Sequence, residues 1–237
     1  MPAQLRRSAS AFAAEVETLL RSTVLASDDA PSLDIKQVGS SITVRTMPSA
    51  PAVLTSKGQP LLLLDLNYRL EIARDGSYLR VLGSAFQIRP TARKSEPLFR
   101  YDFLSQPEAS AVPTAHLNVY AHRDELLHAM YVSQKSHSYP GQSRDIDASR
   151  PRGLHQLHFP LGGTRFRPCL EDILELVINE FGIDTVPGWE EAITVGRISW
   201  RHIQLAAAVR DDPETARDAL REIGAEAFTD EAHLARY

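Results

Sequence analysis

Residues 154–184 read LHQLHFPLGGTRFRPCLEDILELVINEFGID, and this stretch predicts a strand, a glycine turn and a helix in succession. Polar and apolar residues alternate over 154–159, which is the period of a half-buried strand. Pro160 has no N–H to donate to a sheet and should end that strand. An apolar stripe at helical spacing then predicts a helix over 168–181, and Gly182 suits its C-cap. The stripe consists of Leu170, Ile173, Leu174, Val177 and Phe181.

The same alternation predicts further strands in the rest of the chain. Asp75-Gly76 is typical of a hairpin turn between the first two of them, and Gly83 marks a bulge in the second. Residues 33–58 contain short β-prone pieces whose place in the fold the pattern does not give. The predicted strands cover 64–73, 78–88, 98–104, 115–121 and 154–159.

Helices are expected at both ends of the chain. An apolar stripe predicts one at 3–25, and a short helix is expected at 123–132, before a polar loop at 133–153. After Gly182 the pattern is helical, and Pro213 fits the first turn of the last helix. Within this C-terminal region a further apolar stripe is formed by Ile198, His202, Leu205 and Val209.

These elements predict the α+β class, with an antiparallel sheet of about five or more strands covered by helices on one face. We expect an N-terminal helix within residues 1–30 and a core domain of sheet plus packing helix at 31–184. A C-terminal helical region at 185–237 should pack on the same domain. The helix at 168–181 is the expected main packing partner of the sheet, because it is the most apolar helix next to a strand.

Composition limits the classes of function. The chain is 43% hydrophobic and 24% charged, as in ordinary soluble globular proteins, and its formal net charge is −4. An acidic chain has no overall field that draws it to nucleic acid or to a membrane, so an anion site must be local. The single cysteine, Cys169, excludes an internal disulfide framework and a multi-thiolate zinc site. No apolar run reaches the ~20 residues of a membrane helix. We therefore expect a cytoplasmic protein with no membrane partner.

Strand alternation places five polar side chains on the sheet face that the helices leave uncovered: Arg100, Asp102, His116, Asn118 and His158. Histidine can exchange a proton near neutral pH and a carboxylate can orient it, so Asp102, His116 and His158 are candidate catalytic residues. Arg100 and Asn118 are candidate substrate-binding residues. The alternative is that alternation alone requires polar residues here, with Arg100 and Asp102 forming a surface ion pair.

Residues 150–168 are locally basic and contain no acidic residue. Arg165 and Arg167 lie between the Gly162-Gly163 turn and the predicted helix, where guanidinium groups and backbone N–H groups can act together on a phosphate. We therefore expect these two arginines to bind RNA or another phosphate-bearing ligand. The alternative is that both are solvated loop arginines.

No motif identifies a cofactor or a metal. The glycine pair is neither a Walker loop nor a dinucleotide fingerprint, and there is no nucleophile elbow. His155 and His158 are three residues apart on a predicted strand and point to opposite faces, so they should not bind one metal. The sequence therefore predicts no metal site and leaves the cofactor unknown.

Three segments carry a family resemblance: FRYDF (99–103), AHLNVYAH (115–122) and LHFPLGGTRFRPCLEDILELVINEFG (157–182). They resemble a family of uncharacterised actinobacterial proteins and, more distantly, the TumE-like toxins of type II toxin–antitoxin systems. The resemblance implies a toxin-like or defence-associated protein and carries over Arg100, Asp102 and His158. The chain departs from the toxins in its length, in its loop at 133–153 and in having separated histidines.

Two functions from different classes follow. The first is a toxin-like protein, an RNA-directed hydrolase with its site on the polar sheet face. The second is a non-catalytic module that binds a cognate protein partner through its sheet face or its C-terminal helices. The sequence leaves open whether the protein is an enzyme.

Overall fold

The computed structural model covers residues 1–237, and the structure describes residues 2–25, 31–73, 76, 78–91, 97–105, 112–120, 159–161, 165 and 167–224. Several expected features lie outside these ranges. They are the helix at 123–132, the loop at 133–153, His158 with most of its strand, and the Gly162-Gly163 turn.

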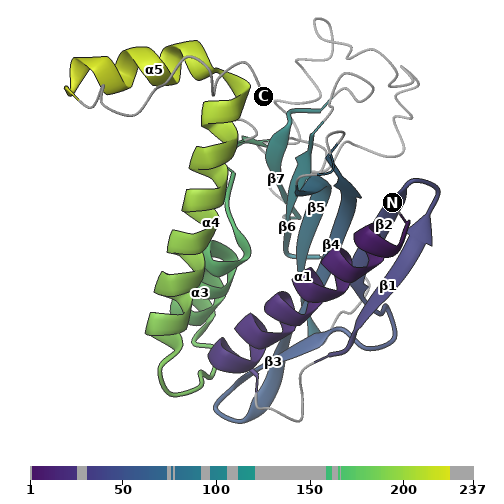
Figure 1. The fold of residues 1–237 in the computed structure, drawn as a ribbon. Coiled ribbons are helices and arrows are strands. Elements are labelled where there is room, and N and C mark those ends of the chain that lie inside the picture. The colour runs from purple at the N-terminus through teal and green to yellow at the C-terminus, as the bar shows by residue number, and fades with distance from the viewer. Residues whose placement is uncertain are drawn as a thin grey trace, which may run out of the picture.

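The described strands form an eight-stranded sheet in the order β1-β2-β4-β5-β6-β7-β8, and β3 pairs with β4 beyond the end of β2 (Figure 1). Every pairing is antiparallel. The predicted antiparallel sheet of five or more strands is thus confirmed. The strands are β1 (Leu33–Val38), β2 (Ser41–Thr46), β3 (Ala52–Ser56), β4 (Gln59–Ile72), β5 (Leu79–Pro90), β6 (Phe99–Leu104), β7 (Ala115–Val119) and β8 (Phe159–Pro160).

The hairpin between β4 and β5 follows the sequence pattern closely. Gly76 in the turn has φ 76°, a conformation that glycine adopts without strain. Gly83 pairs with Arg69, and the next pair joins Leu70 to Val81, so one residue of β5 is left over beside Gly83. The bulge expected at Gly83 is therefore present, and it lies at the neighbouring residue.

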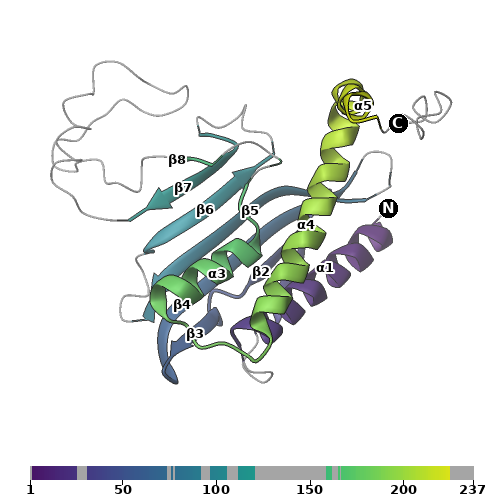
Figure 2. The same cartoon turned by 90° about the vertical axis from the view of Figure 1, so that its left-hand side faces the viewer.

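Helices α1 (Pro2–Thr23) and α3 (Leu170–Phe181) lie across the same face of the sheet, as Figure 2 shows, and α4 (Trp189–Asp211) contacts both helices. The last helix, α5 (Pro213–Glu222), has Pro213 in its first turn and no buried residue. Helices and strands share one hydrophobic core. Its fully buried side chains include Leu20, Ile42, Leu54, Leu64, Leu66, Leu70, Ile88, Ile173, Leu174 and Ile193.

Three expectations about the elements need correction, and a segment that the pattern did not place is resolved into strands. The helix predicted from residue 168 begins at Leu170, because Cys169 keeps an extended backbone as its N-cap; Gly182 is the left-handed C-cap that we expected. The last described strand includes Pro160, one residue further than predicted. Residues 33–58, which the pattern did not place, form β1, β2 and β3. Helix α3 shares the sheet with α1, whose Leu5, Ala9, Ala13, Val16 and Leu20 are buried in the same core.

The apolar stripe on α4 faces away from this core. Ile198, Leu205 and Val209 are 47%, 64% and 45% exposed, and the buried residues of α4 are Ile193 and Ala207. In the described part of the chain, no helix is long and apolar enough to cross a membrane.

Candidate functional site

The β6–β7 pair brings four of the predicted site residues together. Asp102 pairs with His116 and Arg100 pairs with Asn118 across the two strands, so all four share one face. Asp102 Oδ2 accepts from Arg100 Nε at 2.7 Å and from Asn118 Nδ2 at 2.9 Å, and it lies 3.5 Å from His116 Nε2. These residues alternate with Phe99, Tyr101 and Phe103, which lie on the helix side. The predicted phase of both strands is thus correct. We call these four residues the Asp102 cluster.

The Asp102 cluster is mostly buried and satisfies the Asp102 charge internally. The Asp102 side chain is 11% exposed and His116 is 3% exposed. Burial alone would raise the pKa of Asp102, but the hydrogen bond from His116 and the charge of Arg100 outweigh it and hold this pKa below its ordinary value. Nδ1 of His116 lies 2.8 Å from the carbonyl oxygen of Pro113, so the ring is held between that oxygen and Asp102.

Asn118 is the least exposed member of the cluster, at 1%, and its Oδ1 has no hydrogen-bond partner among the residues that the structure describes. Its Nδ2 donates to Asp102, so Asn118 orients the Asp102 carboxylate. His158, the other predicted catalytic residue, lies outside the described residues. The described members of the cluster therefore form a hydrogen-bonded network in which Arg100 and Asn118 donate to Asp102.

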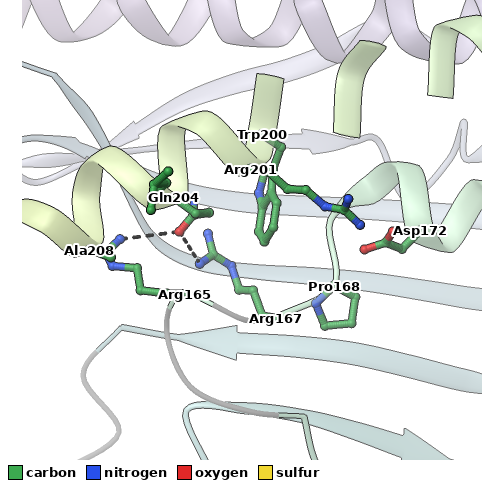
Figure 3. A pocket seen from close by; sticks show the side chains of 9 residues that line it. Arg165, Arg167, Pro168, Asp172, Trp200, Arg201, Gln204 and Ala208 are labelled. Carbon is green, nitrogen blue, oxygen red and sulfur yellow. Dashed lines mark hydrogen bonds between the residues drawn. The ribbon is translucent and has the colours of Figure 1, made fainter. Parts of the chain in front are cut away.

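Arg165 and Arg167 contribute to a second site, a cavity of about 470 Å³ between the start of α3 and the flank of α4 (Figure 3). We call it the arginine cavity. Nη1 of Arg165 and Nη1 of Arg167 each lie 3.5 Å from Oε1 of Gln204, so two guanidinium groups converge on one neutral acceptor. The residues that line it are Arg165, Arg167, Pro168, Asp172, Trp200, Arg201, Gln204, Leu205 and Ala208.

Arg167 is nearly buried, whereas a solvated loop arginine would be exposed. It is 9% exposed, and its Cζ lies 3.8 Å from the centroid of the Phe103 ring and 5.7 Å from that of Trp200. Burial, followed by the charge of Arg165, lowers the pKa of Arg167 to about 10. The surroundings of Arg167 therefore disfavour its positive charge, because a lowered pKa means that the charged form of a base costs free energy.

Arg165 is held from the other side. Asp211 Oδ2 accepts from its Nε at 2.9 Å and from its Nη2 at 2.7 Å, but the Asp211 side chain is 58% exposed. Such an exposed ion pair contributes little to stability and is screened by salt. It fixes the direction of Arg165 and still leaves the guanidinium facing the cavity (Figure 3).

Trp200, Arg201 and Gln204 complete the cavity, and the sequence pattern did not indicate them as site residues. Arg201 is exposed and forms no ion pair within the described residues. Asp172 is the one carboxylate of the lining, and Arg197 already donates to it at 2.8 Å. The spacing of 200, 201 and 204 on a helix places these side chains on one flank, which the sequence could have indicated. Nothing in the sequence indicates that this flank meets residues 165–168.

The two sites lie on opposite faces of the sheet. Arg167 stacks on Phe103, whose side chain points to the helix side, whereas the neighbouring Asp102 points away from the helices. The expectation that Arg165 and Arg167 hold a substrate for the sheet-face residues therefore does not match their placement. The structure groups Arg100, Asp102, His116 and Asn118 together, and it places the two arginines elsewhere.

The start of α3 adds less to an anion site than we expected. The backbone N–H of Cys169 already donates to Asp172 Oδ2 at 3.0 Å, and Pro168 has no N–H. Burial, together with the nearby Glu171 and Asp172, raises the pKa of the Cys169 thiol, so this cysteine is not an activated nucleophile. Within the described ranges no three His, Cys, Asp or Glu residues are grouped to hold a metal ion.

Comparison with known proteins assigns no family to the chain. No protein-family model matches it, and no curated protein and no solved structure matches it either. The geometry of the two sites is therefore what indicates a function.

Proposed function

We propose that the protein binds a phosphate-bearing ligand in the arginine cavity. The observation that carries this proposal is the convergence of Arg165 and Arg167 on the single oxygen of Gln204, with Arg201 lining the same cavity. Guanidinium groups bind phosphate oxygens through paired, charge-assisted hydrogen bonds. An anion placed at this point would contact both groups at once.

The pKa values of the two sites favour the arginine cavity over the Asp102 cluster. Both Asp102 and Arg167 have a lowered pKa, but the meaning differs between an acid and a base. For Asp102 it means that the surroundings stabilise the charged form, and for Arg167 it means that they destabilise the charged form. The negative charge of Asp102 is therefore already stabilised by its neighbours in the cluster. An anion bound beside Arg167 would offset the cost of its buried charge.

RNA is one ligand of the proposed class, and a toxin-like or defence-associated role in the cytoplasm stays a prediction. Hydrolysis by Asp102, His116 and His158 is a separate prediction, because the described residues of that cluster lie on the other face of the sheet from the arginine cavity. A substrate held by Arg165 and Arg167 would not meet His116. Binding is what the geometry supports best.

Isothermal titration calorimetry with pyrophosphate as the probe tests the proposal. Wild-type protein should bind pyrophosphate at low ionic strength, and added salt should weaken the binding. Arg165→Gln should weaken it by about tenfold or more, since a hydrogen bond to a charged group contributes about 1.5–3 kcal/mol. The fold should survive, because the exposed pair with Asp211 contributes little.

Arg69→Gln is the matched control, because it removes the same charge from an exposed residue of β4. Arg69 alternates with the buried Tyr68 and Leu70, so its side chain lies on the face away from the helices. This variant should keep the wild-type affinity. Absence of pyrophosphate binding at low salt, or equal weakening by both variants, would refute the arginine cavity as the binding site.

A second candidate function, binding of a partner protein, is favoured by the exposed apolar stripe on α4. Ile198, Leu205 and Val209 present aliphatic side chains to solvent, and Leu220 of α5 and its C-cap residue Ile223 add to them at 40% and 77% exposure. Exposed apolar groups of this kind mark protein interaction sites. A stripe that binds a partner should tolerate Ile198→Ser without a change in melting temperature, whereas a clear fall would show that Ile198 supports the fold.

A further inference from the structure

The arginine cavity has an aromatic and apolar wall beside its cationic one. Trp200 lies between Arg167 and Arg201 in Figure 3, and Pro168, Leu205 and Ala208 also line the cavity. A site for inorganic phosphate alone needs no such wall. An indole face flanked by guanidinium groups instead suits a planar ring that is joined to an anion.

We propose that the ligand is a small molecule of the nucleoside monophosphate class, with its ring against Trp200 and its phosphate between Arg165 and Arg167. This inference rests on the proposed function, because it assumes that the phosphate binds in the arginine cavity. It adds the chemical class of the ligand and gives Trp200 the role of a stacking surface.

The size of the cavity favours a small molecule over a nucleic-acid strand. Its volume of about 470 Å³ is within the usual range for small-ligand sites, roughly 300–1,000 Å³. Single-stranded nucleic acids are bound along positively charged grooves that follow several nucleotides. The formal net charge of −4 and the confinement of Arg165, Arg167 and Arg201 to one cavity do not provide such a track.

The arrangement of the polar groups also gives each part of the ligand its own place. The Gln204 oxygen lies where Arg165 and Arg167 meet, so a phosphate bound there would displace a weak neutral acceptor. Trp200 projects from α4 toward the cavity one turn before Gln204, within reach of a ring attached to that phosphate (Figure 3). Stacking and charge then act on opposite ends of one molecule.

Calorimetry with three ligands separates the contribution of the ring from that of the phosphate. The ligands are 5′-AMP, ribose 5-phosphate and adenosine, and the affinity of each is compared with that of pyrophosphate. The chain has two tryptophans, so a Trp189→Phe background lets fluorescence report on Trp200 alone. We expect 5′-AMP to bind at least tenfold more tightly than ribose 5-phosphate and to quench Trp200. Adenosine should bind at least tenfold more weakly than 5′-AMP.

Trp200→Leu keeps an apolar wall but removes the stacking face. This variant should bring 5′-AMP to the affinity of ribose 5-phosphate while it keeps pyrophosphate binding within about twofold. If pyrophosphate binds but 5′-AMP gains nothing over ribose 5-phosphate, the ring site is refuted and the phosphate site stands. If neither pyrophosphate nor 5′-AMP binds, both proposals are refuted. A single-stranded RNA tetranucleotide that binds over a hundredfold more tightly than 5′-AMP would overturn the restriction to small molecules.

Discussion

At the scale of single residues, the buried charges of Asp102 and Arg167 have opposite electrostatic surroundings. Asp102 receives hydrogen bonds from Arg100 and Asn118 and lies beside His116, so its negative charge is stabilised. Arg167 is buried beside another arginine, so its positive charge is costly even though its guanidinium stacks on the Phe103 ring. The charge of Asp102 therefore stabilises the fold without a ligand, whereas a bound anion would stabilise the charge of Arg167.

We expect Asp102→Asn to lower the free energy of unfolding by about 1–3 kcal/mol at pH 7, because it weakens the hydrogen bonds of a mostly buried charged group. The effect should depend on pH. The pKa of Asp102 is lowered in the folded state, so its charge stabilises the fold above the unfolded pKa of about 3.9. That contribution is lost as the pH falls through the folded pKa. Urea unfolding at pH 7, 5 and 3 measures the difference.

The control is Asp218→Asn, which changes a side chain that is 63% exposed. It should leave stability within about 0.5 kcal/mol at each pH. A difference between wild type and Asp102→Asn that stays constant from pH 7 to pH 3 would show that the charge of Asp102 does not contribute.

At the scale of the elements, α3 joins the arginine cavity to the core. Only Pro168 and the N-cap residue Cys169 separate it from Arg167, and its buried stripe packs into the core that α1 and the sheet share. Leu174 is fully buried in mid-helix. We expect Leu174→Ala to cost roughly 2–5 kcal/mol, because it removes buried methyl groups and leaves a cavity. Thermal and urea unfolding measure this cost.

Ile203→Ala on α4 provides the comparison, since Ile203 is 61% exposed. It should change stability by less than about 0.5 kcal/mol. A Leu174→Ala protein that unfolds within error of wild type would mean that α3 does not anchor the helical layer.

Local pattern predicts the elements well where one face of each is buried. The alternation in 64–73, the turn glycine Gly76 and the stripe of α3 all appear in the structure. The three strands within 33–58 have the same alternation over fewer residues, as in the buried Ile42 and Val44 of β2, and short segments give a weak signal. Helix α4 shows the limit of pattern, because its apolar stripe is exposed and its mixed polar and aromatic flank lines the arginine cavity.

At the scale of the whole molecule, the sheet separates the two groups of candidate residues. Sequence alternation predicts which side chains of β6 and β7 share a face, and it therefore identifies the Asp102 cluster. It does not predict on which side of the sheet residues 165 and 167 lie, because that depends on the path of the chain into α3. Nor does it predict that Trp200 and Gln204 meet Arg167, since those contacts join distant segments.

The proposed anion site can be tested by a substitution that places a negative charge in the arginine cavity. Gln204→Glu places a carboxylate at the oxygen on which Arg165 and Arg167 converge, with almost no change of shape. The carboxylate should raise the melting temperature by about 2–6 °C, because it gives Arg165 and Arg167 a charged acceptor in place of a neutral one. The same change should weaken pyrophosphate binding more than tenfold, because the anion site is then occupied.

Gln59→Glu adds the same charge at an exposed position of β4, away from the cavity. It should neither raise the melting temperature nor weaken pyrophosphate binding. The measurement is a thermal melt of wild type, Gln204→Glu and Gln59→Glu, each with and without pyrophosphate. We predict that Gln204→Glu is more stable than wild type and no longer responds to pyrophosphate. A Gln204→Glu protein that is no more stable than wild type and is still stabilised by pyrophosphate to the wild-type extent would contradict an anion site in the arginine cavity.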